Sequence, residues 1–274
     1  FSPRICLQSS YGILLVLFLC AFVGTAHDDN LEELFHNSLR KGEYVKAKGY
    51  ADIYLKMATK KFGEEHPITS LAYYYKGQSY YENADFFEAK KAYKSALLIA
   101  EKHFGPLNQR VVPILFGLAK VGIALGQHEV SKSLVLRGLE VANRSKNISL
   151  TEIAEGQYLL AKVAADEGKT EEATVFAKEC LGSARLLELR PNRSLIDCLE
   201  GVGILSFLVE KNRTEAETLL REALSIAEKE YGKEHPVYAD ILTSFAQFNK
   251  ITGDFERAMQ GFDSAMDIMG KKVG

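Results

Sequence analysis

Apolar residues recur along most of the chain at the three- and four-residue spacing of amphipathic helices. The stretch Ser70–Phe104 shows this most clearly, and we interpret it as two helices joined at Asn83–Asp85. Small residues lie on the facing sides of these helices, with Gly77 in the first and Ala89 and Ala96 in the second. Such residues allow two helices to approach closely. The stretch therefore predicts an antiparallel pair of helices.

The pattern of small residues recurs through the whole chain. Steps of 42, 42, 42 and 43 residues connect the positions equivalent to Gly77, which are Ala119, Ala161, Gly203 and Ala246. The extra residue in the last step falls in the predicted turn Glu210–Arg213. Helix pairs at a fixed period bury their apolar faces against one another in sequence, as in a solenoid. We therefore predict an all-α fold, an α-solenoid of about six helix-turn-helix repeats.

The predicted repeats form a single domain that spans residues 27–274. They lie at about residues 28–66, 70–104, 112–146, 154–188, 196–231 and 239–270. Two connectors between repeats have similar sequences, FGEEHP at Phe62–Pro67 and YGKEHP at Tyr231–Pro236, with the same glycine, glutamate, histidine and proline. The glycine can end one helix and the proline can begin the next. We expect His66 and His235 to make hydrogen bonds that shape these connectors.

The first 26 residues differ from the rest of the chain. Residues Ile5–Ala26 carry no charge, and Gly12–Val23 is almost wholly apolar. Arg4 precedes this run and the small residues Gly24–Ala26 follow it, which is the layout of a secretory signal peptide. We predict that residues 1–26 are a signal peptide and that the protein resides in the secretory lumen or outside the cell. The alternatives are an anchor in an organelle membrane (plastid or mitochondrion) and a helix that caps the solenoid.

Sequons and cysteines bear on the compartment. Four Asn-X-Ser/Thr sequons fall in predicted turns and are candidates for N-glycosylation if the chain enters the endoplasmic reticulum: Asn143, Asn147, Asn192 and Asn212. Beyond the leader the chain has two cysteines, Cys180 and Cys198. We expect both to be buried thiols, and pairing between them is the alternative because they could lie near each other.

Composition and motifs argue against several classes of function. The net charge is −2 and no basic run occurs, which disfavours binding to nucleic acid. The sequence contains no phosphate-binding glycine loop, no HExxH pair and no Cys/His spacing of a zinc site. We therefore expect no enzyme activity, no catalytic residues, no cofactor and no metal.

The helix pairs resemble tetratricopeptide repeats, in the 42-residue variety of kinesin light chains. The matching positions are Tyr73, Gly77, Tyr80, Ala89, Tyr93 and Ala96 in the second repeat and Ala246, Ala258, Phe262 and Ala265 in the sixth. The two shared connectors strengthen the resemblance, which covers roughly Asp28–Met269. It implies a right-handed superhelix that binds other proteins.

In such arrays the first helices line a concave groove that takes an extended peptide or a partner helix. The repeat phase places these residues in the groove: Tyr74, Gln78, Tyr81, Phe116, Lys120, Tyr158, Lys162, Phe207 and Gln247. Aromatic anchors beside amide or amine donors suit peptide recognition. The alternative is that the aromatic side chains pack within or between repeats.

We predict a non-enzymatic scaffold that binds a protein or peptide partner in its groove. One alternative is a membrane-anchored factor that assembles a complex in a plastid or mitochondrion. Another is a cytosolic cargo adaptor of the kinesin-light-chain kind. In each case we expect no nucleic-acid partner, and we expect membrane contact only through the N-terminal segment.

Overall fold

The computed structural model describes residues 28–145, 149–186 and 193–273. These residues form twelve α-helices and one short 3₁₀ helix, and no strand occurs among them. The elements are α2 (Asp28–Arg40), α3 (Tyr44–Phe62), α4 (Pro67–Glu82), α5 (Phe86–Phe104), η1 (Gln109–Val111), α6 (Val112–Ala124), α7 (His128–Arg144), α8 (Leu150–Asp166), α9 (Thr170–Arg185), α10 (Arg193–Glu210), α11 (Arg213–Tyr231), α12 (Pro236–Ile251) and α13 (Phe255–Val273).

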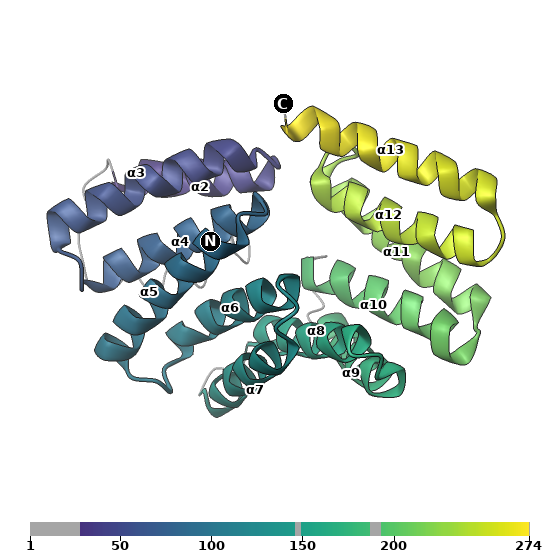
Figure 1. Cartoon of the computed structure of the whole chain (residues 1–274), viewed down its shortest axis with the longest axis horizontal. Coiled ribbons are helices and arrows are strands. Elements are labelled where there is room, and N and C mark those ends of the chain that lie inside the picture. Colours follow the sequence, from purple (N-terminus) through teal and green to yellow (C-terminus); the bar gives the residue numbers. More distant parts are fainter. Residues whose placement is uncertain (1–27, 146–148, 187–192, 274) are drawn as a thin grey trace, which may run out of the picture.

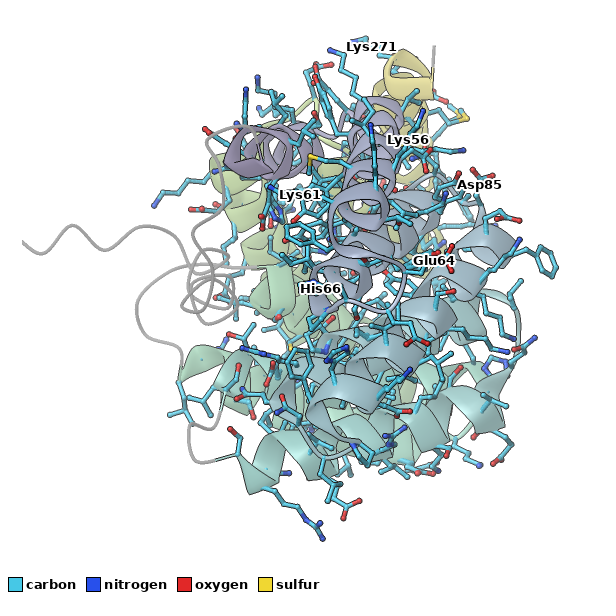
Figure 2. All side chains as sticks on the ribbon, turned by 90° about the vertical axis from the view of Figure 1, so that its left-hand side faces the viewer. Lys56, Lys61, Glu64, His66, Asp85 and Lys271 are labelled. Carbon is cyan, nitrogen blue, oxygen red and sulfur yellow. A yellow bond between two sulfur atoms is a disulfide. The ribbon has the colours of Figure 1, made fainter. Side chains whose placement is uncertain are left out.

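Consecutive helices form pairs, and each pair packs mainly on the next. Figure 1 shows the pairs arranged in an arc, with α2 and α3 at one end and α12 and α13 at the other. The helices α4, α6, α8, α10 and α12 lie on the inner side of this arc, which we call the concave surface. The predicted all-α solenoid is confirmed. Charged side chains such as Lys56, Lys61 and Glu64 project from the first helix pair and its connector (Figure 2).

The turn inside each helix pair contains one residue with positive φ. These residues are Gly42, Ala84, Gly126, Gly168, Lys211 and Gly253, with φ between 55° and 86°. Glycine adopts this left-handed conformation without steric cost, which explains its use at four of the six turns. The spacing is 42 residues except before Lys211, where it is 43. The extra residue of the fifth repeat therefore lies close to the predicted turn.

Two close helix contacts are built around Tyr93 on α5. A Cβ atom added at Gly77 would lie 2.6 Å from the Tyr93 ring, and one added at Gly117 would also lie 2.6 Å from it. The tyrosine is 3% exposed. Its ring fits between α4 and α6 because both facing positions lack a side chain. The predicted use of Gly77 at a close helix contact is confirmed.

Histidines cap the helices that follow the two shared connectors. The backbone N–H of Ile68 donates to Nδ1 of His66 at 3.2 Å, and that of Val237 donates to Nδ1 of His235 at 3.1 Å. Each imidazole thereby satisfies one of the free N–H groups at a helix start. The predicted role of these histidines is confirmed.

Two details differ from the sequence analysis. Cys180 on α9 and Cys198 on α10 are both buried, but they form a disulfide rather than two thiols. Their Cα atoms lie 5.6 Å apart, a separation that a disulfide spans easily. In addition, α13 extends beyond the predicted end of the sixth repeat, at about residue 270, to Val273. Because the predicted leader 1–26 lies outside the described residues, the fold does not test it.

The packing around Tyr93 predicts that Gly77→Leu destabilises the protein by about 1–3 kcal/mol, because an added side chain must displace a buried ring. Urea unfolding followed by circular dichroism measures the change. The matched control is Gly49→Ala on α3, where an added Cβ meets no atom within 4 Å. We expect this control to be stabilised by about 0.5–1 kcal/mol, since alanine favours a helix over glycine. Equal effects of the two substitutions would contradict the proposed packing.

Candidate functional site

A small cavity opens on the concave surface between α4, α6 and α8. Its volume is about 60 Å³, and it is lined by Tyr74, Gln78, Tyr81, Glu82, Tyr93, Pro113, Gly117, Lys120 and Glu155. Four of these residues were predicted to face a groove: Tyr74, Gln78, Tyr81 and Lys120. The structure therefore brings part of the predicted set together at one place. Tyrosine walls beside an amide and a charge pair can hold both apolar and polar groups.

An ion pair closes one side of this cavity. Nζ of Lys120 lies 2.5 Å from Oε1 of Glu155, and the lysine side chain keeps 37% exposure although protein surrounds it on several sides. Burial by itself would lower the pKa of Lys120, but the Glu155 carboxylate outweighs it and raises the pKa above its usual value. The ammonium therefore stays charged, and it is already paired before any ligand arrives.

A second ion pair lies further along the concave surface, on α10 and α12. Nε of Arg193 donates to Oδ1 of Asp197 at 2.7 Å, and Nη2 of Arg193 lies 3.7 Å from Oδ2 of Asp240. Glu82, at the end of α4, lies within electrostatic range of Arg193 on α10 and Asp240 on α12. The end of α4 therefore faces α10 and α12 across the arc. The surrounding protein raises the pKa of both Glu82 and Asp240, although both side chains remain exposed, and Arg193 opposes this rise. We call Glu82, Lys120, Glu155, Arg193, Asp197 and Asp240 the central cluster.

Glu200 on α10 lies next to the central cluster. The hydroxyl of Ser244 on α12 donates to its Oε1. Burial raises the pKa of Glu200 to about 7, and the hydrogen bond from Ser244 opposes this rise. At neutral pH the carboxyl group is therefore divided between its two protonation states.

The remaining predicted groove residues divide into three groups. Phe116 is 1% exposed, and its ring occupies the space left by Gly138 and Gly156, so its placement in a groove was wrong. Tyr158 and Phe207 are half-buried, and both pack against neighbouring repeats. Phe207 makes an edge-to-face contact with Phe248, with ring centroids 5.4 Å apart.

Lys162 and Gln247 are exposed on α8 and α12. The described part of the chain provides no hydrogen bond or ion pair for the Lys162 ammonium, although Asp240 lies within electrostatic range. The binding role of these two residues remains a prediction.

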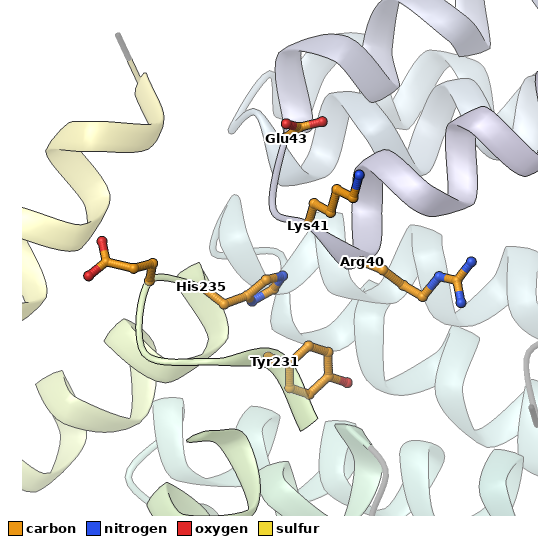
Figure 3. Close-up of a pocket in the computed structure, with 6 residues that line it drawn as sticks. Arg40, Lys41, Glu43, Tyr231 and His235 are labelled. Atoms are coloured by element: carbon orange, nitrogen blue, oxygen red, sulfur yellow. The ribbon is translucent and has the colours of Figure 1, made fainter. Parts of the chain in front are cut away.

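The first and last repeats approach each other at a second cavity. It has a volume of about 340 Å³ and is lined by Arg40, Lys41, Glu43, Tyr231, Glu234 and His235 (Figure 3). A Cβ atom added at Gly42, in the turn between α2 and α3, would lie 2.5 Å from Cδ of Pro236. The two ends of the arc are therefore in contact at this point.

The sequons and the described helices bear on modification and membranes. Asn212 caps α11, where its Oδ1 accepts the backbone N–H of Glu215 at 3.2 Å. Asn143 lies in the last turn of α7 rather than in the predicted turn after it, whereas Asn147 and Asn192 lie outside the described residues.

None of the described helices has the length and apolar content needed to cross a membrane. Within the same residues, no three His, Cys, Asp or Glu side chains gather as a metal site.

Comparison with known proteins places the repeats in a family. The sequence model of the family described as Tetratricopeptide repeat matches residues 199–271, which hold most of the last two helix pairs. The other four pairs continue the same period and the same packing. The last two helix pairs therefore match the tetratricopeptide-repeat family, and the described chain as a whole has the corresponding solenoid fold. No curated protein sequence matches the chain.

Solved structures with a similar fold cover most of this chain. The TPR-like repeats of a putative kinesin light chain from Podosopora anserina share 18% identity over 75% of this chain and 98% of that one, with a TM-score of 0.54. BtubC (BKLC) from P. vanneervenii shares 17% over 92% and 94%, with a TM-score of 0.56. A Rap protein complexed with competence and sporulation factor shares 16% over 90% and 78%, with a TM-score of 0.63. At these identities the similarity concerns the fold.

Most of the central cluster was not predicted from the sequence. Glu155, Asp197 and Asp240 occupy equivalent positions, separated by 42 and 43 residues, on three successive first helices. The repeat phase alone could have identified this row of carboxylates. Glu82 and Arg193 come close only because the arc curves, which no spacing in the sequence indicates.

The environment of Glu200 predicts a pH-dependent effect of Glu200→Gln. The pKa of Glu200 in the folded protein is about 7, which exceeds that of a glutamate in the unfolded chain. At any pH between these two pKa values the folded state therefore holds a proton on Glu200 that the unfolded state has lost. Wild-type stability therefore falls as the pH rises from about 4.5 to about 7, and then this contribution stays constant. The free energy of unfolding of Glu200→Gln minus that of wild type should therefore be about 1–3 kcal/mol larger at pH 8 than at pH 4.5.

Urea unfolding at several pH values measures this difference. Glu179→Gln, at an exposed site on α9, is the matched control. A stability difference between Glu200→Gln and wild type that does not change with pH would contradict the assignment.

Proposed function

We propose that the protein is a non-enzymatic scaffold that binds an extended peptide of a partner protein on its concave surface. The observation that carries this proposal is the cavity in which Tyr74, Gln78 and Tyr81 of α4 meet the Lys120–Glu155 pair. The tyrosine rings offer apolar surface with little loss of side-chain entropy on binding, and the Gln78 amide can both donate to and accept from a peptide backbone.

The structural relatives support the same proposal. Two Rap proteins of similar fold have been solved as complexes, one with competence and sporulation factor and the other with the Phr* peptide. Those ligands belong to the Rap proteins. For the present chain they support binding of a peptide by a solenoid of this shape.

Selection from a displayed library of random dodecapeptides tests the proposal, with enriched peptides resynthesised and measured by fluorescence anisotropy on the full chain. We expect Gln78→Ala and Lys162→Glu each to weaken binding about tenfold or more, as for residues at the centre of an interface. Lys162 is preferred over Lys120 because reversing the charge of Lys120 would place two carboxylates side by side and disturb the fold.

The matched control is Lys94→Glu on the outer helix α5, where the lysine is exposed. Equal loss of binding in Lys94→Glu and Lys162→Glu would indicate a nonspecific charge effect. Unchanged binding in both concave-surface variants would place the site elsewhere and overturn the proposal.

We further propose that the scaffold works in the secretory lumen or outside the cell. The disulfide between Cys180 and Cys198 supports this location, because such bonds persist in oxidising compartments. The exposed Asn212 sequon is consistent with it, since an N-linked glycan needs an accessible loop.

The mature N-terminus and the glycans of the protein from its native source test the location. We expect the chain to begin at His27, and we expect at least one sequon asparagine to lose its glycan when mutated to glutamine. An unglycosylated chain that keeps Gly12–Val23 would favour an organelle anchor or the cytosol instead.

A further inference from the structure

The last helix, α13, carries an apolar stripe that no other part of the described chain covers fully. The stripe consists of Phe255, Met259, Phe262, Met266 and Met269. Phe255, Met259 and Met266 are 69%, 63% and 64% exposed, Met269 is 41% exposed, and Phe262 is half-buried. Their spacing of four, three, four and three residues places all five side chains on one face of the helix. In Figure 1, α13 lies at the outer end of the arc, next to α12.

The equivalent face of α11 shows what normally covers such a stripe. The residues 42 positions before Phe262, Met266 and Met269 are Leu220, Leu224 and Ala227. Leu220 is buried in a cluster with Phe248 of α12, and Ala227 and Leu224 pack in a cluster with Val237 and Ile241 of the same helix. In the interior of the solenoid the C-terminal part of this face therefore packs against the first helix of the next repeat, whereas the positions equivalent to Phe255 and Met259 are the charged residues Arg213 and Glu217. On α13 the corresponding face is open to another helix.

The side chains of the stripe suit a helical partner of variable sequence. Three of the four methionines of the chain lie in it. Methionine is unbranched and polarisable, so surfaces rich in it adapt to different apolar partners. Open apolar faces of this size on soluble proteins commonly mark interaction sites.

Charge on α13 indicates which kind of helix fits. Glu256, Asp263 and Asp267 are exposed along the edge of the stripe that faces away from α12. Within the described residues, Asp263 and Asp267 form no ion pair. A second copy of α13 packed antiparallel about Phe262 would bring its own Asp263 next to this acidic edge, and like charges repel there. A helix with lysine or arginine beside its apolar face would instead be attracted.

We propose that the α13 stripe is a docking site for an amphipathic helix of a partner protein, with apolar residues on one face and basic residues beside it. The helix lies on α13 as α12 lies on α11, and it extends the solenoid by one further helix. The site is separate from the concave surface, so a peptide and a docking helix can bind at the same time.

The test uses the full chain and a fluorescein-labelled synthetic helix of 19 leucine and lysine residues, with leucine at the positions of one face. We expect the double variant Met259→Ser/Met266→Ser to weaken binding at least about tenfold. We expect Asp263→Asn/Asp267→Asn to weaken it several-fold and to reduce its salt dependence. Phe262 is left unchanged because its half-buried ring contributes to folding.

Three controls make the test decisive. Leu98→Ser/Leu136→Ser removes two exposed leucines from the outer helices α5 and α7 and should bind like wild type. A leucine–glutamate peptide of the same pattern should bind much more weakly than the lysine peptide. Gln78→Ala should bind the helix like wild type, which separates this site from the proposed peptide site.

Several outcomes would overturn the proposal. These are unchanged binding in the methionine double variant, equal binding of the lysine and glutamate peptides, and loss of binding in Gln78→Ala alone. Two further outcomes would replace the occupant. One is a concentration-dependent dimer in sedimentation that Met259→Ser/Met266→Ser abolishes, and the other is binding to phosphatidylcholine vesicles that the same variant abolishes.

Discussion

The close approach of the two helices in each pair is the constraint on which the rest of the structure depends. It requires small residues where the helices meet and one left-handed residue in the turn that joins them. Tyr93 shows the consequence, because its ring fits only where Gly77 and Gly117 leave space. No helix pair buries its apolar residues alone, so each depends on its neighbours, and the small rotation between successive pairs produces the curvature of the arc.

The curvature of the arc in turn produces the electrostatics of the concave surface. Charges from α4, α6, α8, α10 and α12 converge there, and the surrounding protein shifts the pKa values of Glu82, Glu200 and Asp240 upward. Placing such groups on a concave surface costs stability. Proteins accept such costs mostly where a site has to bind something. The end of the solenoid differs, since α13 exposes Met266 and Met269, whereas Leu224 and Ala227 at the equivalent positions of α11 pack against α12.

The sequence by itself determined the helices, their pairing, the turns and the connector histidines. Each of these depends on residues close together in the chain or at a nearly fixed period: a glycine in a turn, a histidine before a proline, a small residue after every 42 or 43 positions. For the same reason, part of the cavity lining was predictable, because Tyr74, Gln78 and Tyr81 share one face of one helix. Phe116 was misplaced because the repeat phase indicates a helix face but not which neighbour has room for the ring.

Only the tertiary structure decided which distant groups meet. The disulfide depends on the 5.6 Å approach of two Cα atoms on α9 and α10, and the contact of Gly42 with Pro236 depends on the sum of small rotations between six helix pairs. The pairing of Arg193 with Asp240 follows from the packing of α10 beside α12. Local patterns specify each helix and each turn. A distance across the arc, in contrast, depends on the packing angle at every interface between successive helix pairs, so no single stretch of sequence determines it.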